Sequence, residues 1–205
     1  MILCSASPTR AKLLKKAGID FIQKNCDFDE EKIKTDDPYE FVMLASYGKF
    51  KSCLECFGND DIVAADTVVS SGGEILRKAA SKEEAREILL KQSGNEIKII
   101  TSMWMQYKGR IFSRLDETVY EFSEFDKNDL ENYISSGDWQ GKAGACMVEG
   151  FCKKYIKNVK GYESTAMGLC VEELLKVVKM VKESEKNGQL KNEDLEKYKY
   201  LNPKS

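Results

Sequence analysis

The feature that most constrains the fold is a pair of long strand-like runs, residues 96–107 and 110–122, joined at Lys108-Gly109. Both runs are rich in β-branched and aromatic residues, and a two-residue connection that contains glycine is typical of a tight β-hairpin. This is the clearest hairpin in the sequence. It predicts an antiparallel pair of long strands inside whatever sheet the rest of the chain builds.

Shorter strand-like and helix-like segments alternate around the hairpin. The expected strands are residues 2–4, 21–23, 62–65, 75–76 and 155–159, and the expected helices are residues 8–17, 38–56, 82–92, 127–136 and 170–182. Ser7, Ser81 and Asp126 stand where helix N-caps are favoured, and Gly18 and Gly137 stand where helices end. Alternating helices and strands with one inserted hairpin predict an α/β fold with a mixed sheet.

Length and charge limit the number of domains and the kinds of partner that the chain can have. The chain has 205 residues, which predicts one domain over residues 1–182 and a charged tail over residues 183–205. The formal net charge is −2, so the charge balance does not favour nucleic acid or an anionic membrane surface as a partner. No apolar run is long enough to span a bilayer, and the first residues do not resemble a signal peptide. We therefore expect a cytoplasmic protein.

The chain contains no histidine. Ser-His-Asp and Cys-His nucleophilic catalysis and histidine-based zinc sites are therefore excluded. An enzyme with this composition must rely on carboxylates, lysines, hydroxyls and a metal. The seven cysteines are an odd, scattered set, and Cys53 and Cys56 form a CxxC in a helix-like stretch. We interpret all of them as reduced thiols, and expect neither disulfides nor structural zinc.

Four clusters of polar residues are candidates for chemistry. Residues 5–10 cross a strand-to-helix junction, where free N–H groups and Arg10 can bind an anion, although plain helix capping would also explain them. Residues 27–31 are acidic and form either a metal site or a solvated loop. Asp66-Thr67 follows a buried strand, where a carboxylate can hold Mg²⁺ or orient water, unless it only forms a turn.

The fourth cluster consists of lysines. Lys49, Lys78 and Lys142 can each be a phosphate ligand or an ordinary surface residue. A Walker-type ATPase is not expected, because residues 137–142 are one residue short of the P-loop motif and no hydroxyl follows Lys142.

Taken together and in order, these clusters resemble the Maf family of nucleotide pyrophosphatases, also described as septum-formation inhibitors. The segments that carry the resemblance are ILCSASPTR (2–10), DFDE (27–30), IVAADTVV (62–69), ILRK (75–78), SG (93–94) with Thr101, GDWQGKAG (137–144), EG (149–150) and GL (168–169). The resemblance implies an elongated mixed sheet flanked by helices, with two lobes and a cleft as in inosine triphosphate pyrophosphatases, and a homodimer. It also implies hydrolysis of a nucleoside triphosphate to monophosphate and pyrophosphate with Mg²⁺ or Mn²⁺.

Carried over position by position, the resemblance also implies roles for single residues. Asp66 is the expected catalytic base or metal ligand, Glu30 its acidic partner in catalysis and metal binding, and Lys78 a catalytic, phosphate-facing lysine. The expected substrate-binding residues are Ser5, Arg10, Lys49, Thr67 and Glu149.

Substrate choice depends on positions where the chain departs from the family pattern. Thr9 replaces an arginine, Ala79 a proline, and Cys146 an aromatic residue, while Glu149 replaces the glutamine of one major branch. The segment 139–144 resembles that same branch and favours a pyrimidine substrate, dTTP or UTP. The Glu149 carboxylate offers only acceptors and favours N7-methyl-GTP instead. Two more hypotheses stay open, a deaminated-purine triphosphate pyrophosphatase and a non-catalytic regulator of septum formation.

Overall fold

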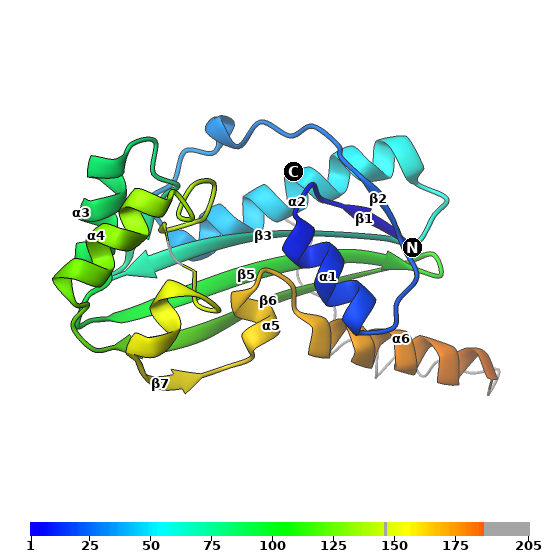
Figure 1. Ribbon diagram of the computed structural model, residues 1–205. Helices are drawn as coiled ribbons and strands as arrows, with labels where there is room; N and C mark the ends of the chain where they lie inside the picture. The colour runs from blue at the N-terminus through cyan, green and yellow to red at the C-terminus, as the bar shows by residue number, and fades with distance from the viewer. Residues whose placement is uncertain (146, 187–205) are drawn as a thin grey trace.

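A computed structural model describes residues 1–145 and 147–186, which form a seven-stranded sheet in the order β2-β1-β3-β5-β6-β7, with β4 paired to β3 (Figure 1). The strands are β1 (Ile2–Cys4), β2 (Ile22–Lys24), β3 (Ile62–Ser71), β4 (Glu74–Leu76), β5 (Glu96–Tyr107), β6 (Arg110–Phe122) and β7 (Ile156–Lys160). The helices are α1 (Pro8–Lys16), α2 (Pro38–Phe57), α3 (Lys82–Gln92), α4 (Lys127–Ser136), α5 (Glu163–Ala166) and α6 (Val171–Lys186), with short 3₁₀ helices η1 (Glu30–Lys32) and η2 (Phe151–Tyr155). The expected α/β fold with an elongated mixed sheet is confirmed.

The β5–β6 hairpin has the expected bounds and turn. Its register runs from Glu96↔Glu121 to Tyr107↔Arg110. Lys108 and Gly109 have φ values of 50° and 72°, and two successive positive φ values match the hairpin turn that follows the twist of the strands. Strand β3 pairs antiparallel with β5 on the edge that β6 leaves open, and the pairing covers nearly all of β3. These three long strands form the platform on which the other elements pack (Figure 1).

The helices begin and end near the residues that the sequence indicates. The side chains of Ser7, Ser81 and Asp126 each accept a hydrogen bond from a backbone N–H in the first turn of α1, α3 and α4. Helix α4 ends at Gly137, which has φ 79°. Each N-cap of this kind stabilises its helix by roughly 1 kcal/mol.

Strand β3 is longer than the sequence indicates. It continues past residue 65 to Ser71, because the side chains that follow Thr67 are buried again and pair with β5. The expectation that Asp66 and Thr67 lie just after the end of a strand is therefore wrong. Both residues lie inside β3, where the backbone positions are fixed by the ladder.

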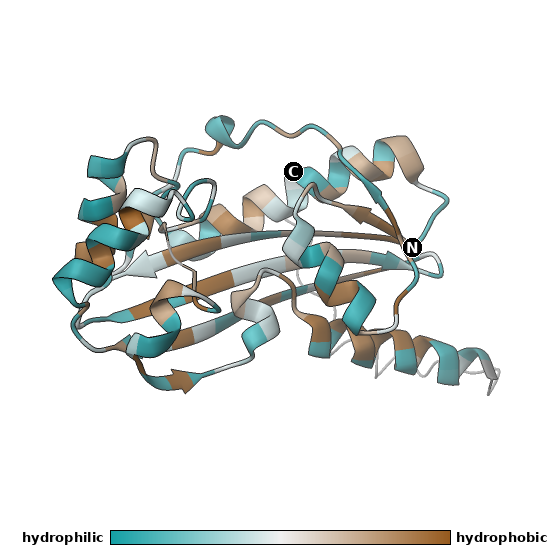
Figure 2. Cartoon of the chain, viewed as in Figure 1, coloured by the Kyte–Doolittle hydropathy of each residue, from teal (hydrophilic) through white to brown (hydrophobic). Residues whose placement is uncertain are grey.

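Helices cover both faces of the sheet, and one face is divided. Helix α2 packs on the face that carries Ala64 and Val68. On the opposite face, Val63 packs with α1 and α6, while Val69 packs with α3 and α4. Thr67 lies between these two apolar clusters, which form the cores of two lobes. In Figure 2 the hydrophobic colour is concentrated along the strands and on parts of the helices that cover them.

Among the described residues, no helix combines the length and apolar character that a membrane crossing requires. Helix α6 continues to Lys186, so it runs past the expected domain boundary at residue 182. The remainder of the expected charged tail, residues 187–205, lies outside the described part of the chain, as does Cys146.

Gly161 provides a test of this packing. It joins β7 to α5 with φ +120°, and a Cβ there would lie 2.6 Å from the Glu117 carbonyl oxygen. Gly18 also has positive φ, +71°, but a Cβ there would meet nothing within 4 Å. We expect Gly18→Ala to cost about 1 kcal/mol and Gly161→Ala about 2–4 kcal/mol, since only the second adds overpacking to backbone strain. Urea denaturation of both variants measures this, and equal losses would contradict the described contact.

Candidate active site

The site lies at a break in the sheet beside β3. Strand β5 occupies one edge of β3 from Ile62 to Ser70. The other edge is shared, because β1 pairs with its first two residues and β4 pairs with Val69 and the residues after it. Asp66 and Thr67 lie between these two pairings. At this point β3 has no neighbouring strand on that edge within the described part of the chain.

The segments that follow β1 and β4 approach this break from opposite ends. Strand β1 runs parallel to β3, so the chain after β1, which begins with Ser5, continues along β3 toward Asp66. Strand β4 runs antiparallel to β3, so the chain after β4, which contains Lys78, approaches Asp66 from the opposite direction. Lys78 forms a bridge with Ala143, which brings in the glycine-rich segment. A cavity of about 260 Å³ opens here, lined by Arg10, Lys49, Asp66, Thr67, Lys78, Lys142 and Glu149 among others.

Lys49 of α2 connects Asp66, which lines the cavity, with Glu30 of η1. Its Nζ lies 2.5 Å from Asp66 Oδ1 and 2.5 Å from Glu30 Oε1. The two carboxylate oxygens are therefore no farther apart than twice that distance. Residues 27–31 and Asp66 were separate clusters in the sequence, and the fold joins them through one ammonium group.

Asp66 is the most buried of these charges, with its side chain 10% exposed against 40% for Glu30. Burial raises the pKa of Asp66 above that of an ordinary aspartate, because desolvation disfavours the charged form. The positive charges of Lys49 and Arg10 oppose this shift of the pKa. A carboxyl group with a raised pKa is a stronger base when it is ionised.

Arg10 is held in place by three hydrogen bonds. Its Nε donates to the Gly168 carbonyl oxygen at 2.7 Å, Nη1 to Ser5 Oγ at 3.2 Å, and Nη2 to Thr67 Oγ1 at 3.2 Å. A guanidinium carries five N–H groups, so two remain for an anion in the cavity. Burial lowers the pKa of Arg10, while Asp66 and Glu30 act against that shift. An arginine remains charged under such conditions.

Ser5 and Thr67 have positioning roles that the sequence did not specify. The Ser5 hydroxyl accepts from Arg10 and from the Ser7 N–H at 3.1 Å. Thr67 Oγ1 lies 2.9 Å from Thr101 Oγ1, which in turn donates to the Thr165 carbonyl oxygen at 2.7 Å. Sequence reasoning missed Thr165 as a member of this chain of hydrogen bonds, because it lies far from the other residues in sequence and matches no motif.

Gly168 is a second residue whose role was missed. It has φ +102°, and a Cβ there would lie 3.2 Å from both Arg10 Nε and Thr67 Oγ1. Glycine therefore lets the backbone approach the guanidinium closely enough to accept its hydrogen bond. The GL pair at 168–169 was a recognisable motif, but its partner could not be read from the sequence.

Lys78, Lys142 and Glu149 line the same cavity. Within the part of the chain that the structure describes, neither lysine has an ion pair that would neutralise its charge. Lys142, which the sequence analysis treated only as a candidate, therefore joins the predicted residues. Glu149 is exposed at the rim.

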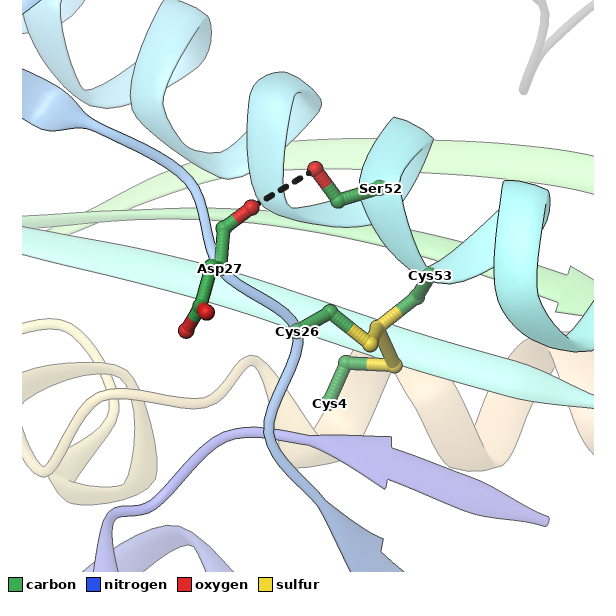
Figure 3. Close-up of a disulfide and its surroundings, with 5 residues drawn as sticks. All are labelled: Cys4, Cys26, Asp27, Ser52 and Cys53. Atoms are coloured by element: carbon green, nitrogen blue, oxygen red, sulfur yellow. Dashed lines mark hydrogen bonds between the residues drawn. A yellow bond between two sulfur atoms is a disulfide. The ribbon is translucent and has the colours of Figure 1, made fainter.

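The cysteines are arranged differently from expectation. The Sγ atoms of Cys4, Cys26 and Cys53 lie within 4.8 Å of one another, and the Cys53 sulfur is in bonding contact with both of the others (Figure 3). The contacts of Cys53 with Cys4 and Cys26 contradict the expectation of reduced thiols without disulfides for these three residues. Cys56, the other member of the CxxC, is exposed and free, so the CxxC itself is not a pair.

Comparisons with known proteins show which family the chain is similar to. A family model described as "Maf-like protein" matches residues 1–181. A "Nucleoside triphosphate pyrophosphatase" from a Nitratiruptor species is 56% identical over 180 residues, covering 86% of this chain and 97% of that protein. Proteins of the same name from Helicobacter pylori and Campylobacter jejuni are 44% and 37% identical, covering 88% and 85% of this chain and 95% and 97% of those proteins.

A solved structure, "Structure of a HAM1 protein from Coxiella burnetii", aligns with 87% of this chain and 97% of that chain at 14% identity. Its TM-score of 0.42 is too low to establish a common fold. The family model and the close relatives are decisive on their own, and they confirm the resemblance found in the sequence: the chain belongs to the Maf family.

Proposed function

We propose that this protein hydrolyses a nucleoside triphosphate at the linkage between the α- and β-phosphates, releasing the monophosphate and pyrophosphate. The observation that carries the proposal is the Lys49 ammonium between Asp66 and Glu30, inside a cavity that also contains Arg10 and Lys78. Acidic and basic groups meet there as a phosphoryl-transfer reaction requires. The name shared by the family relatives supports the same reaction.

The cationic groups of the cavity suit a triphosphate. Arg10, Lys78 and Lys142 contribute charges that no carboxylate of the described residues neutralises by a direct ion pair, and they surround the position of Asp66. Arginine and lysine are the side chains best suited to phosphate, the first by paired N–H groups and the second as a point charge. We therefore assign them to the phosphates of the substrate.

The donor set fits Mg²⁺ or Mn²⁺. Asp66 and Glu30 supply carboxylate oxygens, which these ions prefer, and both oxygens already face one position that a cationic nitrogen occupies. When bound there, the ion would neutralise phosphate oxygens and make a coordinated water more acidic. Lys49 must then shift from its present place between the carboxylates toward the phosphates.

We assign the other catalytic roles to residues of the chain. Asp66 orients the attacking water and accepts its proton, a role favoured by its raised pKa. Arg10, tethered through Ser5, Thr67 and Gly168, holds its charge at a fixed place during the reaction. Lys78 stabilises the negative charge that develops on the leaving pyrophosphate. Most of the rate then comes from positioning and charge stabilisation.

For the base we propose a pyrimidine, dTTP or UTP, on the basis of the segment 139–144. Glu149 at the cavity rim is the feature that favours a second candidate, N7-methyl-GTP. A carboxylate can accept hydrogen bonds from the guanine N–H groups, and its negative charge suits the cationic ring of that base. A deaminated purine triphosphate is a third candidate. A non-catalytic regulator of septum formation would not require Asp66, Glu30 and Lys49 to converge in a cavity.

Two further expectations remain proposals. We propose a homodimer in the cytoplasm, following the family resemblance. Helix α2 presents exposed apolar side chains at Met43, Leu44 and Tyr47, and size-exclusion chromatography with light scattering measures whether the protein associates.

Asp66→Asn tests the reaction. The change keeps the volume and one acceptor oxygen but removes the charge and the ability to take up a proton. We expect kcat for pyrophosphate release to fall about 10²- to 10⁴-fold, while affinity for a non-hydrolysable triphosphate changes less, because the cationic residues remain. The melting temperature should show a folded protein. Asp36→Asn is the matched control, because Asp36 is exposed and lies outside the cavity.

Undiminished turnover in folded Asp66→Asn would remove this residue from the mechanism. If the wild type releases pyrophosphate from no canonical or modified triphosphate with Mg²⁺ or Mn²⁺, the regulator hypothesis replaces the enzyme.

Glu149→Gln tests the choice of base. An amide adds a donor that a carboxylate lacks, so we expect the ratio of kcat/KM for UTP to that for N7-methyl-GTP to rise about tenfold. Glu87→Gln, an exposed glutamate of α3 outside the cavity, should leave the ratio unchanged. Faster turnover of N7-methyl-GTP than of dTTP and UTP by the wild type would reject the pyrimidine assignment.

A further inference from the structure

Three cysteines from distant parts of the chain meet beside the cleft. Cys4 ends β1, Cys26 lies in the loop after β2, and Cys53 lies on α2 (Figure 3). Their sulfurs are within 4.8 Å of one another, and the Cys53 sulfur contacts both partners. A cysteine sulfur can form only one disulfide. Two disulfides therefore cannot both form, which leaves either one disulfide beside a free thiol or a ligand shared by all three sulfurs.

The spacing suits one thiophilic cation. A Zn–S bond is about 2.3 Å long, so two sulfurs on the same zinc ion lie at most about 4.6 Å apart. The three sulfurs lie within 4.8 Å of one another, so one ion can reach all three once side-chain rotation separates the Cys53 sulfur from its two partners. Cysteine thiolates prefer Zn²⁺ over the hard Mg²⁺ and Mn²⁺. This group is therefore chemically distinct from the two carboxylates of the active site.

The backbone around the three cysteines is fixed by regular structure. Cys4 is held by the pairing of β1 with β2 and is 4% exposed, and Cys53 is 0% exposed. Ser52 Oγ donates to the Asp27 carbonyl oxygen at 3.0 Å, which ties the loop next to Cys26 to the helix next to Cys53 (Figure 3). A ligand set on fixed elements loses little entropy when it binds a metal.

The surroundings leave one side of the three sulfurs open. Cys4 and Cys26 line a pocket together with Arg10, Lys49 and Lys142 of the active-site cleft. The same pocket gives solvent or a small anion access to the group of sulfurs, so a fourth ligand need not come from the protein.

We propose that Cys4, Cys26 and Cys53 bind one Zn²⁺ ion through three thiolates, with the fourth position open to the cleft. The site joins the segments that carry three active-site residues. Cys4 immediately precedes Ser5, Cys26 precedes the acidic segment 27–31, and Cys53 is one helical turn after Lys49. The ion thereby fixes the relative positions of these segments. This role does not depend on which nucleotide the protein hydrolyses.

The test uses the full-length protein, purified in reductant, mixed with a small excess of ZnSO₄ and dialysed. We expect about one zinc ion per chain by elemental mass spectrometry. With Co²⁺ in place of Zn²⁺, the intense near-ultraviolet absorption of cobalt–thiolate bonds should appear. Cys26→Ser should bind Co²⁺ about 100-fold more weakly and show clearly weaker absorption at the same Co²⁺ concentration. Cys56→Ser is the matched control, because Cys56 lies on α2 but is exposed and free, and it should behave as the wild type.

Three results would overturn the proposal. The first is equal zinc retention by Cys26→Ser and the wild type. The second is a wild-type protein without the cobalt–thiolate absorption. The third is a purified protein whose mass is lower by two hydrogens and whose paired cysteines persist in reductant, which would make the group a disulfide with a neighbouring thiol. Cys26 is the least buried of the three, and the cobalt spectrum of the wild type gives an answer even if the variant fails to fold.

Discussion

The arrangement of the site depends on how the two edges of β3 are used. One edge pairs with β5 almost throughout, which fixes the backbone of β3. The other is divided between the parallel β1 and the antiparallel β4. Backbone groups inside a protein are normally paired, so a break of this kind is retained where another group must enter. Asp66 and Thr67 lie at the break, and the segments that leave β1 and β4 bring basic residues to them.

Charge pairing then determines how the cavity is organised. A buried carboxylate such as Asp66 is costly without a partner, and Lys49 supplies one while also reaching Glu30. Arg10 is anchored by three polar groups from three separate segments. Anchoring of this kind keeps a charge at one place with little cost in entropy when a substrate binds. The proposed phosphate-binding role of Arg10 relies on this fixed position.

The group of Cys4, Cys26 and Cys53 lies next in the chain to the segments that carry the residues of the cavity. The Asp66 carboxylate lines the cavity, while Cys4 and Cys26 line an adjoining pocket, and oxygen and sulfur donors favour different cations. The CxxC was the visible pattern in the sequence, yet Cys53 turns toward Cys4 and Cys26 while Cys56 faces solvent.

Features that arise within a few residues of one another could be predicted from the sequence. The hairpin turn at Lys108-Gly109, the caps at Ser7 and Asp126, and the mixed α/β class all follow from local backbone preferences and periodicity. The family resemblance added the identity of the acidic and basic residues. Contacts between distant segments could not be predicted in this way, among them the path of β3 through Asp66 and the link from Lys49 to Glu30. They form because burying the apolar faces of helices and strands brings those segments together, which no local pattern records.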